Sequence, residues 1–480
     1  MSSSGKSNSV VIKVSIIAAL AGLLFGLDIA YVNGALAFID KEFSLTVEQS
    51  GDVAGYLLAG AAVGALFSGW LSRQFGRKKV LVLSALIFTG ATLFTITLHD
   101  FSLFLAARFI MGLGVGVASF VAPLYLSEIA PYKIRGALIA LYQLMITIGI
   151  FLMFLSNAAL EHTGSWRLML GVLLIPSLIM LIGTFTLPES PRWLALKGRF
   201  DDAKDTLNKI RSNKDEVEFE LAEIRETMQT KSSGFSLLTK GYFLKVVFLG
   251  ILLQTLQQFS GMNAFMYYSG KIFEAAGFSN PAIGTVIVGL VNVLTTFIAI
   301  KWVDKLGRKP ILYSGISILV ISCLVVGYIF NMQASGVQLT ETIQYILVTF
   351  CLLFIFGFAL SLGPVIWIVC SEIFPLQGRD LGVTITTMTN WIMNAVIGEY
   401  TLVWFRDLGV GYTFWMFGFA CFLGFFLVKF FTPETKDVPL EELELNLQRG
   451  KSLKDLGINN NLDSKSPPFN WVVFFYIVVI

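Results

Sequence analysis

The amino-acid sequence predicts an all-α membrane protein in which twelve transmembrane helices form two six-helix bundles. Three observations predict this fold class: the composition of the chain, the spacing of its apolar segments and an internal duplication. Of the 480 residues, 55% are hydrophobic and 14% are charged, and the mean hydropathy is +0.73. A soluble protein of this size has about 25% charged residues. The composition therefore indicates a chain in lipid and excludes a large soluble domain on a single membrane anchor.

Twelve apolar segments, each long enough to cross a bilayer as a helix, follow one another along the chain. They lie at residues 12–38, 51–72, 79–98, 103–126, 136–158, 167–187, 244–270, 282–303, 310–330, 342–370, 381–403 and 411–431. Arg108 is the one basic residue deep within a segment, and only Lys41, Arg167, Lys271 and Arg406 fall on the side of the odd-numbered loops. The positive-inside rule therefore predicts that both termini are cytoplasmic.

The expected domains are an N-terminal six-helix bundle (1–187), cytoplasmic linker helices (188–243), a C-terminal six-helix bundle (244–431) and a cytoplasmic tail (432–480). Apolar residues recur at helical spacing in the polar segment 188–243, which predicts short amphipathic helices, with a flexible linker as the alternative. The apolar end 471–480 would be about 15 Å long as a helix, too short to span the bilayer. We assign it no function.

Three sequence signatures occur twice, once in each half of the chain. Residues 76–78 (Gly-Arg-Lys) match 307–309, residues 127–135 match 371–379, and the Pro-Glu pair that begins at 188 recurs at 433. The copies keep the same order relative to the predicted spans. Such a parallel repeat is typical of transporters whose two halves move against each other.

Composition and motifs exclude several other classes of protein. The four cysteines lie in apolar segments without metal-ligand spacing, and the two histidines lie in short polar connections. No nucleophile–base pair, P-loop or dinucleotide fingerprint is present, which argues against an enzyme, a cofactor and ATP-driven transport. The net charge is only +3 and the charges are scattered, so nucleic acid is not an expected partner.

Two charged residues within the predicted spans are candidates for a functional site. Asp28 lies near the middle of the first span, and Arg108 lies in the outer half of the fourth. Charges at membrane depth are costly and are usually functional. A carboxylate that is ionised when paired and neutral when occluded can carry a proton. A static structural ion pair is the alternative interpretation.

Uncharged polar residues form a second group of candidates. Gln254, Gln257 and Gln258 occupy one face of the seventh span, and Gly261 is expected to loosen the helix after them. Further amides and aromatic residues lie in the other predicted spans: Gln143, Asn263, Tyr267, Asn292, Trp367, Asn390, Trp391 and Asn394. Amides donate and accept hydrogen bonds, and an indole can cover a sugar ring, so this set suits a neutral polyhydroxyl ligand. Hydrogen bonds between helices are the alternative role for each amide.

A third group of charged residues lies at the predicted cytoplasmic ends of the spans. It consists of Arg77, Glu128, Arg135, Arg308, Glu372 and Arg379. Ion pairs among them would hold the inner side shut and break when it opens, as in other switching proteins. Ordinary positive-inside anchoring is the alternative.

From about residue 11 to 457 the chain resembles the sugar porters of the major facilitator superfamily. The resemblance rests on five motifs: residues 69–78, 108–112, 188–193, 257–263 and 433–436. Residues 21–28, 142–149 and 378–380 look, more narrowly, like those of bacterial galactose–proton and arabinose–proton symporters. The resemblance implies proton-coupled monosaccharide uptake by a multi-pass protein of the inner (plasma) membrane, working as a monomer in contact with lipid.

The resemblance also implies roles for individual residues. Asp28 would carry the proton and Arg108 would be its partner. Sugar would be bound by Gln143, Gln257, Gln258, Asn263, Asn292, Trp367 and Asn390, with Phe25, Tyr267 and Trp391 lining the site. A proton-independent sugar uniporter on the same fold and a transporter-like sugar sensor are the alternatives. The charged Asp28 argues against the first, and the short tail argues against the second.

Overall fold

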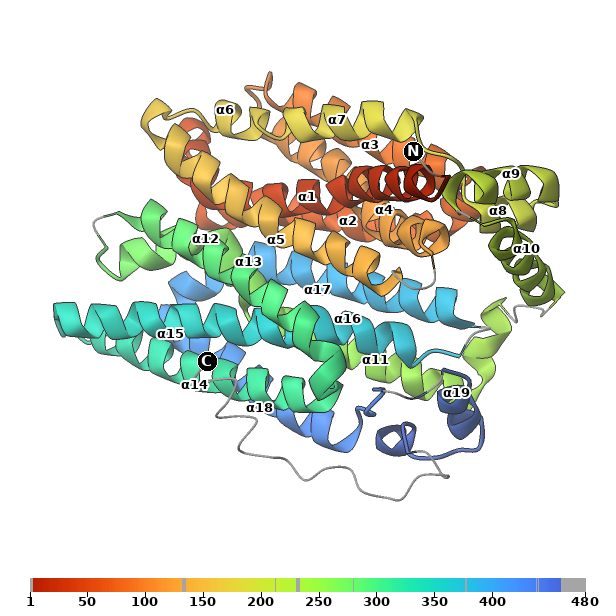
Figure 1. Cartoon of the computed structure of the whole chain (residues 1–480). Helices are drawn as coiled ribbons and strands as arrows, with labels where there is room; N and C mark the ends of the chain where they lie inside the picture. Colours follow the sequence, from red (N-terminus) through yellow and green to blue (C-terminus); the bar gives the residue numbers. More distant parts are fainter. Residues whose placement is uncertain are drawn as a thin grey trace. The chain divides into compact units, whose positions relative to one another are not determined.

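The computed structural model describes residues 3–131, 135–211, 213–229, 234–278, 280–375, 378–436, 438 and 440–458, and the apolar end 471–480 lies outside them. Within these residues the chain is helical and contains no strand (Figure 1). The first half comprises α1 (Ser3–Phe43), α2 (Val47–Phe75), α3 (Arg77–Thr95), α4 (Phe101–Ile129), α5 (Arg135–Leu160), η2 (Glu161–Thr163), α6 (Trp166–Gly171) and α7 (Leu174–Phe185). The sixth predicted span is thus divided in two. Pro176 explains the division, because its ring and missing N–H are incompatible with a continuous helix through Val172.

The segment between the two halves is helical, so the interpretation as a flexible linker is wrong for its described residues. It contains α8 (Pro191–Leu196), α9 (Phe200–Ile210), α10 (Lys214–Gln229) and η3 (Gly234–Thr239). Ala203, Leu207 and Ile210 form the buried face of α9, as their spacing predicts. Arg211 ties this region to α4, because its guanidinium donates to the carbonyl oxygens of Ile129 (2.8 Å) and Ala130 (3.3 Å).

The second half comprises α11 (Gly241–Phe259), α12 (Met262–Ala275), α13 (Pro281–Leu306), α14 (Arg308–Ala334), α15 (Glu341–Leu360), α16 (Leu362–Glu372), α17 (Arg379–Asp407), α18 (Val410–Phe430), α19 (Leu440–Gln448) and η5 (Leu453–Asp455). The seventh predicted span is interrupted at Gly261, whose φ of +86° is a conformation that favours glycine. The tenth is interrupted at Ser361, with φ −124° and ψ −86°. Predicted site residues follow both interruptions, Asn263 after the first and Trp367 after the second.

Among the described residues, eleven segments are long and apolar enough to cross a membrane. They match eleven of the twelve predicted spans, each broken span being covered by a pair of consecutive helices. The remaining prediction, 381–403, lies within α17. At 29 residues, α17 is about 44 Å long and has the length to span a bilayer. Its threonine and asparagine side chains, which include Asn390 and Asn394, lower its hydropathy.

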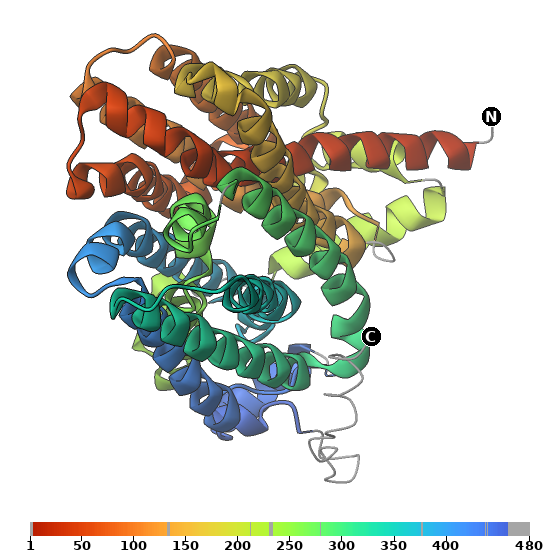
Figure 2. The same ribbon diagram turned by 90° about the vertical axis from the view of Figure 1, so that its left-hand side faces the viewer.

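The chain divides into two compact units. The first contains residues 1–232, 263–293 and 387–403, and the second contains 233–262, 294–386 and 404–480. In the first unit α5 packs on α1, and α4 packs on both α2 and α3. The red and orange helices α1, α2 and α4 lie side by side in Figure 1 and Figure 2. In the second unit α14 contacts α15, α16 and α18. The domain boundaries expected from the sequence remain a prediction.

Candidate functional site

The two charged residues predicted at membrane depth form an ion pair inside the first unit. Arg108 Nη1 on α4 lies 2.6 Å from Asp28 Oδ1 on α1, and the two residues are 0% and 1% exposed. The guanidinium also donates from Nε to the carbonyl oxygen of Val53 on α2 (3.2 Å) and lies over the ring of Tyr31. The structure thus shows the ion pair, and its role in proton coupling stays a prediction. Burial on this scale makes the pair costly to break, since each charge would stay buried without the opposite charge that it contacts.

Two glycines allow close helix packing around the buried ion pair. Gly26, two residues before Asp28, faces α5, where an added Cβ would lie 1.9 Å from the carbonyl oxygen of Ile146. Gly112, four residues after Arg108, faces α2, where a Cβ would lie 1.9 Å from the carbonyl oxygen of Leu57. Glycines at these two positions let the backbones of α1 and α4 approach their neighbours closely.

Several predicted ligand-binding residues come together in the first unit. The rings of Phe25 on α1 and Trp391 on α17 lie 4.9 Å apart between centroids. The hydroxyl of Tyr267 on α12 donates to Asn394 Oδ1 on α17 (3.0 Å). The other predicted members of this unit are Gln143 and Asn263, which are half-buried, and Asn292 and Asn390, which are buried. Asn394 therefore joins the site as a residue that positions Tyr267.

Contacts between α1 and α12 were missed by sequence reasoning. Asn33 Nδ2 donates to Ser269 Oγ (2.8 Å) and to the carbonyl oxygen of Met266 (3.1 Å). Toward the end of α1, Lys271 Nζ pairs with Asp40 Oδ2 at 3.0 Å. Lys271 served only as a marker of orientation in the sequence, because nothing in a single sequence pairs two residues 231 positions apart. These contacts tie α12 to α1 on the predicted outer side.

The remaining predicted ligand-binding residues lie in the second unit. Gln257 on α11 donates from Nε2 to the carbonyl oxygens of Leu362 (2.8 Å) and Gly363 (3.0 Å), in the first turn of α16. Gln258 is buried, whereas Trp367 on α16 is 36% exposed. The amide of Gln257 is therefore held at the interruption between α15 and α16.

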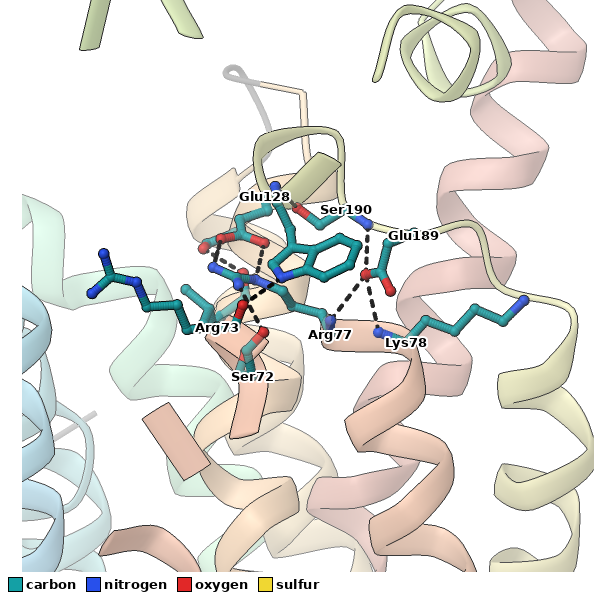
Figure 3. A network of polar contacts seen from close by, with 10 residues as sticks. Ser72, Arg73, Arg77, Lys78, Glu128, Glu189 and Ser190 are labelled. Carbon is teal, nitrogen blue, oxygen red and sulfur yellow. Dashed lines mark hydrogen bonds and ion pairs between the residues drawn. The ribbon is translucent and has the colours of Figure 1, made fainter. Parts of the chain in front are cut away.

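The predicted cytoplasmic residues of the first unit form a compact polar network (Figure 3). Arg77 makes a two-pronged ion pair with Glu128, with Nε–Oε2 and Nη2–Oε1 both at 2.7 Å. Glu189 accepts the backbone N–H groups of Arg77 (2.9 Å) and Lys78 (3.1 Å) through Oε1. It thus caps the N-terminus of α3 from a distant part of the chain, where a negative charge is favoured. The sequence analysis placed Glu189 in the repeat but assigned it no role.

The second copy of the signature makes corresponding contacts in the second unit. Arg308 pairs with Glu372, with Nη2–Oε1 at 2.9 Å. Glu434 accepts the backbone N–H groups of Arg308 and Lys309, both at 2.9 Å, at the start of α14. Gly76 and Gly307 precede the two helices with φ of +95° and +92°. The duplication read from the sequence is therefore also a duplication of structure.

Each of these ion pairs lies within one unit. Arg379 Nη2 donates to the carbonyl oxygen of Phe374 (3.5 Å) in the second unit. The side chain of Arg135 lies outside the described residues. That the set closes the cytoplasmic side stays a prediction.

Glu189 gives a prediction for the pH dependence of stability. Burial raises the pKa of its carboxyl above the ordinary value, although the N–H groups of Ser190, Lys78 and Arg77 favour the charged form. At pH values between the ordinary and the raised pKa, the Glu189 carboxyl holds a proton in the folded state and has released it in the unfolded state. The contribution of Glu189 to the free energy of unfolding therefore falls as the pH rises through this interval.

Glu189→Gln cannot ionise at this position. As the pH rises from about 4 toward neutrality, the melting temperature of the unmodified protein should fall relative to that of this variant. Melting temperatures of the two purified proteins in detergent, measured across this range, test the expectation. Glu161→Gln, at an exposed position, controls for the loss of one negative charge. A difference in melting temperature between the unmodified protein and Glu189→Gln that does not vary with pH would contradict the prediction.

Comparison with known proteins defines the class of this chain. The model of the sugar (and other) transporter family matches residues 14–447, so the chain belongs to that family. The galactose-proton symporter of Escherichia coli (strain K12) is 48% identical over 461 residues, which are 95% of this chain and 98% of the relative. The arabinose-proton symporter of the same strain is 43% identical over 93% of this chain and 95% of the relative.

Solved structures agree with the family assignment. The major facilitator superfamily proton:xylose symporter XylE, bound to 6-bromo-6-deoxy-D-glucose, matches with a TM-score of 0.77 and 29% identity over 94% of this chain and 99% of that one. An inward open conformation of XylE from E. coli gives a TM-score of 0.76 with 28% identity over 91% and 99%. The expectation of a twelve-helix major facilitator fold is confirmed.

Proposed function

We propose that this protein is a secondary active transporter that couples the uptake of a monosaccharide to the inward movement of a proton. The observation that carries the proposal is the ion pair of Asp28 and Arg108, buried in lipid-spanning helices. The names of the relatives, which are symporters of galactose, arabinose and xylose with protons, support it. The substrate class is a hexose such as galactose or glucose, or a pentose such as arabinose.

Asp28 is the proton carrier in this proposal. Its charged form is stabilised by Arg108 at 2.6 Å, and protonation removes that attraction and frees both side chains from the pair. Proton and sugar load from outside, the two halves rearrange, sugar leaves to the cytoplasm, and the proton follows. The cycle needs no ATP and no cofactor, because the proton gradient supplies the free energy.

The proposal keeps the sugar-binding residues that the sequence analysis names. Gln143, Gln257, Gln258, Asn263, Asn292 and Asn390 bind hydroxyl groups, Trp367 covers the ring, and Phe25, Tyr267 and Trp391 line the site. The Arg77–Glu128 and Arg308–Glu372 pairs, with Arg135 and Arg379, form the cytoplasmic gate. The protein acts as a monomer in the inner (plasma) membrane with both termini in the cytoplasm, in contact with lipid and without nucleic acid.

The first test of this function is the pH outside lightly buffered, de-energised vesicles when a panel of sugars is added. Alkalinisation on addition of one sugar supports symport and identifies the substrate. Entry of radiolabelled sugar without a change of pH would favour a uniporter. No entry of any sugar through correctly inserted protein would overturn transport of this class and favour a sensor.

The assignment of the sugar site gives a further prediction. Trp367→Ala and Gln258→Ala should each weaken sugar binding about tenfold or more, because each removes a contact that an alanine cannot replace. Trp70→Ala, which removes an indole that is 63% exposed on α2, is the matched control. Binding is measured by isothermal titration or by sugar-dependent thermal shift. Unaltered affinity in both site variants would remove these residues from the proposed pocket.

A further inference from the structure

Tyr31 makes a contact with the Asp28–Arg108 pair that the proposed cycle does not yet use. It lies one helical turn after Asp28 on α1 and is 0% exposed. The guanidinium carbon of Arg108 lies 5.4 Å from the centroid of its ring, within the range of a cation–π interaction. The guanidinium is therefore held by three groups: the Asp28 carboxylate, the Val53 carbonyl and the Tyr31 ring.

We propose that the ring of Tyr31 is a positioning element that holds the Arg108 guanidinium in place while Asp28 is protonated. This inference rests on the proposed function and adds a residue to its coupling machinery. A protonated Asp28 no longer balances the charge of Arg108, and a buried cation without a partner is strongly disfavoured. The neutral Asp28 carboxyl can still accept a hydrogen bond, but the electrostatic support of the cation then comes from the Val53 carbonyl and the face of the ring.

The geometry places the role in the ring and not in the hydroxyl. Among the described contacts the Tyr31 hydroxyl has no hydrogen-bond partner, although it is buried. The charged groups that act on it are Asp28 and Glu42 on α1, Arg108 on α4 and Arg167 on α6. Glu42 and Arg167 form an ion pair at 2.7 Å, so their charges balance each other. When Asp28 is protonated, Arg108 is therefore the cation of this group that has lost its paired anion.

The Tyr31 ring stabilises the state in which Asp28 is protonated more than the ion-paired state, because in the latter the Asp28 carboxylate already balances the charge of Arg108. Without the ring, proton binding from outside should weaken about tenfold, in line with a desolvated cation–π contact. The external pH for half-maximal uptake should therefore move down by roughly one unit. Exchange of sugar across de-energised vesicles, which needs no net proton movement, should stay within about twofold of the unmodified protein.

The test compares Tyr31→Leu with Tyr31→Phe in uptake as a function of external pH and in sugar exchange. Tyr31→Leu should show the downward shift, and Tyr31→Phe, which keeps the ring, should not. Phe88→Leu, which removes a ring of similar burial on α3, is the matched control and should leave the profile unmoved. A Tyr31→Leu profile equal to that of the unmodified protein overturns the inference.

A second series separates electrostatics from packing and does not depend on whether Tyr31→Leu folds. Phenylalanine analogues with one, two and three ring fluorines at position 31 keep the shape of the ring and progressively weaken its attraction for a cation. The half-maximal pH should fall stepwise along this series, and equal values along it would assign Tyr31 a packing role only. If the unmodified protein shows no sugar-induced alkalinisation, the proposed function fails; if it does and the series is flat, only the role of Tyr31 fails.

Discussion

Asp28→Asn should abolish the accumulation of sugar against a gradient and leave the exchange of sugar measurable. Asparagine has nearly the same shape as a protonated aspartate, but it cannot release a proton to pair with Arg108 as an anion. One proton that crosses a membrane potential of about 100 mV supplies roughly 2.3 kcal/mol, enough for a sugar ratio of roughly 50. The variant should bring that ratio to about one, as in a passive carrier. Uptake and counterflow of radiolabelled sugar in the same vesicles measure the two activities.

Asp100→Asn provides the control for this experiment. Asp100 caps the N-terminus of α4 through the N–H of Leu103, and asparagine is an equally good cap. The Asp100→Asn protein should therefore accumulate sugar like the unmodified protein. Accumulation by the Asp28→Asn protein would move the proton site to another residue, and loss of exchange as well would indicate a structural role for the pair.

Gly26→Ala should have the second largest effect, on the amount of folded protein. The new methyl group would lie 1.9 Å from the carbonyl oxygen of Ile146, and backbone atoms cannot rotate away as a side chain can. Helices α1 and α5 would have to separate, at a cost of about 1–3 kcal/mol or more, typical of overpacked sites. We expect a large loss of the monodisperse protein peak in detergent and a lower melting temperature.

Gly90→Ala is the matched control, because it adds the same methyl group to a transmembrane helix of the same unit. Nothing lies within 4 Å of the added Cβ at this position of α3. Alanine also has the higher helix propensity, so the stability should be unchanged or slightly increased. Equal yield and melting temperature for the two variants would contradict the close α1–α5 packing.

The sequence was sufficient for features that depend on one segment or on the nature of the solvent. Long apolar runs predicted the spans, since a backbone in lipid must satisfy its hydrogen bonds within a helix. Gly261 marked the interruption between α11 and α12 because of its backbone freedom. The Asp28–Arg108 pair could be predicted because two buried charges of opposite sign at similar depth have few other partners.

Most contacts between distant segments were beyond a single sequence. Glu189 and Glu434 look like ordinary loop carboxylates, but each caps a helix that begins more than 100 residues earlier. The pairing of Asp40 with Lys271 likewise depends on how α12 lies against α1. Hydropathy also understates α17, because its threonine and asparagine side chains make it less apolar than the other spans.

The hydrogen bonds of Gln257 bear on how firmly a carrier holds its cargo. The Nε2 group of this amide has internal partners, the carbonyl oxygens of Leu362 and Gly363. A sugar hydroxyl that accepts a hydrogen bond from Nε2 must replace bonds of a similar kind, so the net gain in binding free energy from that bond is small. Internal hydrogen bonds that compete with the ligand in this way limit its binding affinity. A carrier that binds sugar with limited affinity can release it quickly on the other side of the membrane.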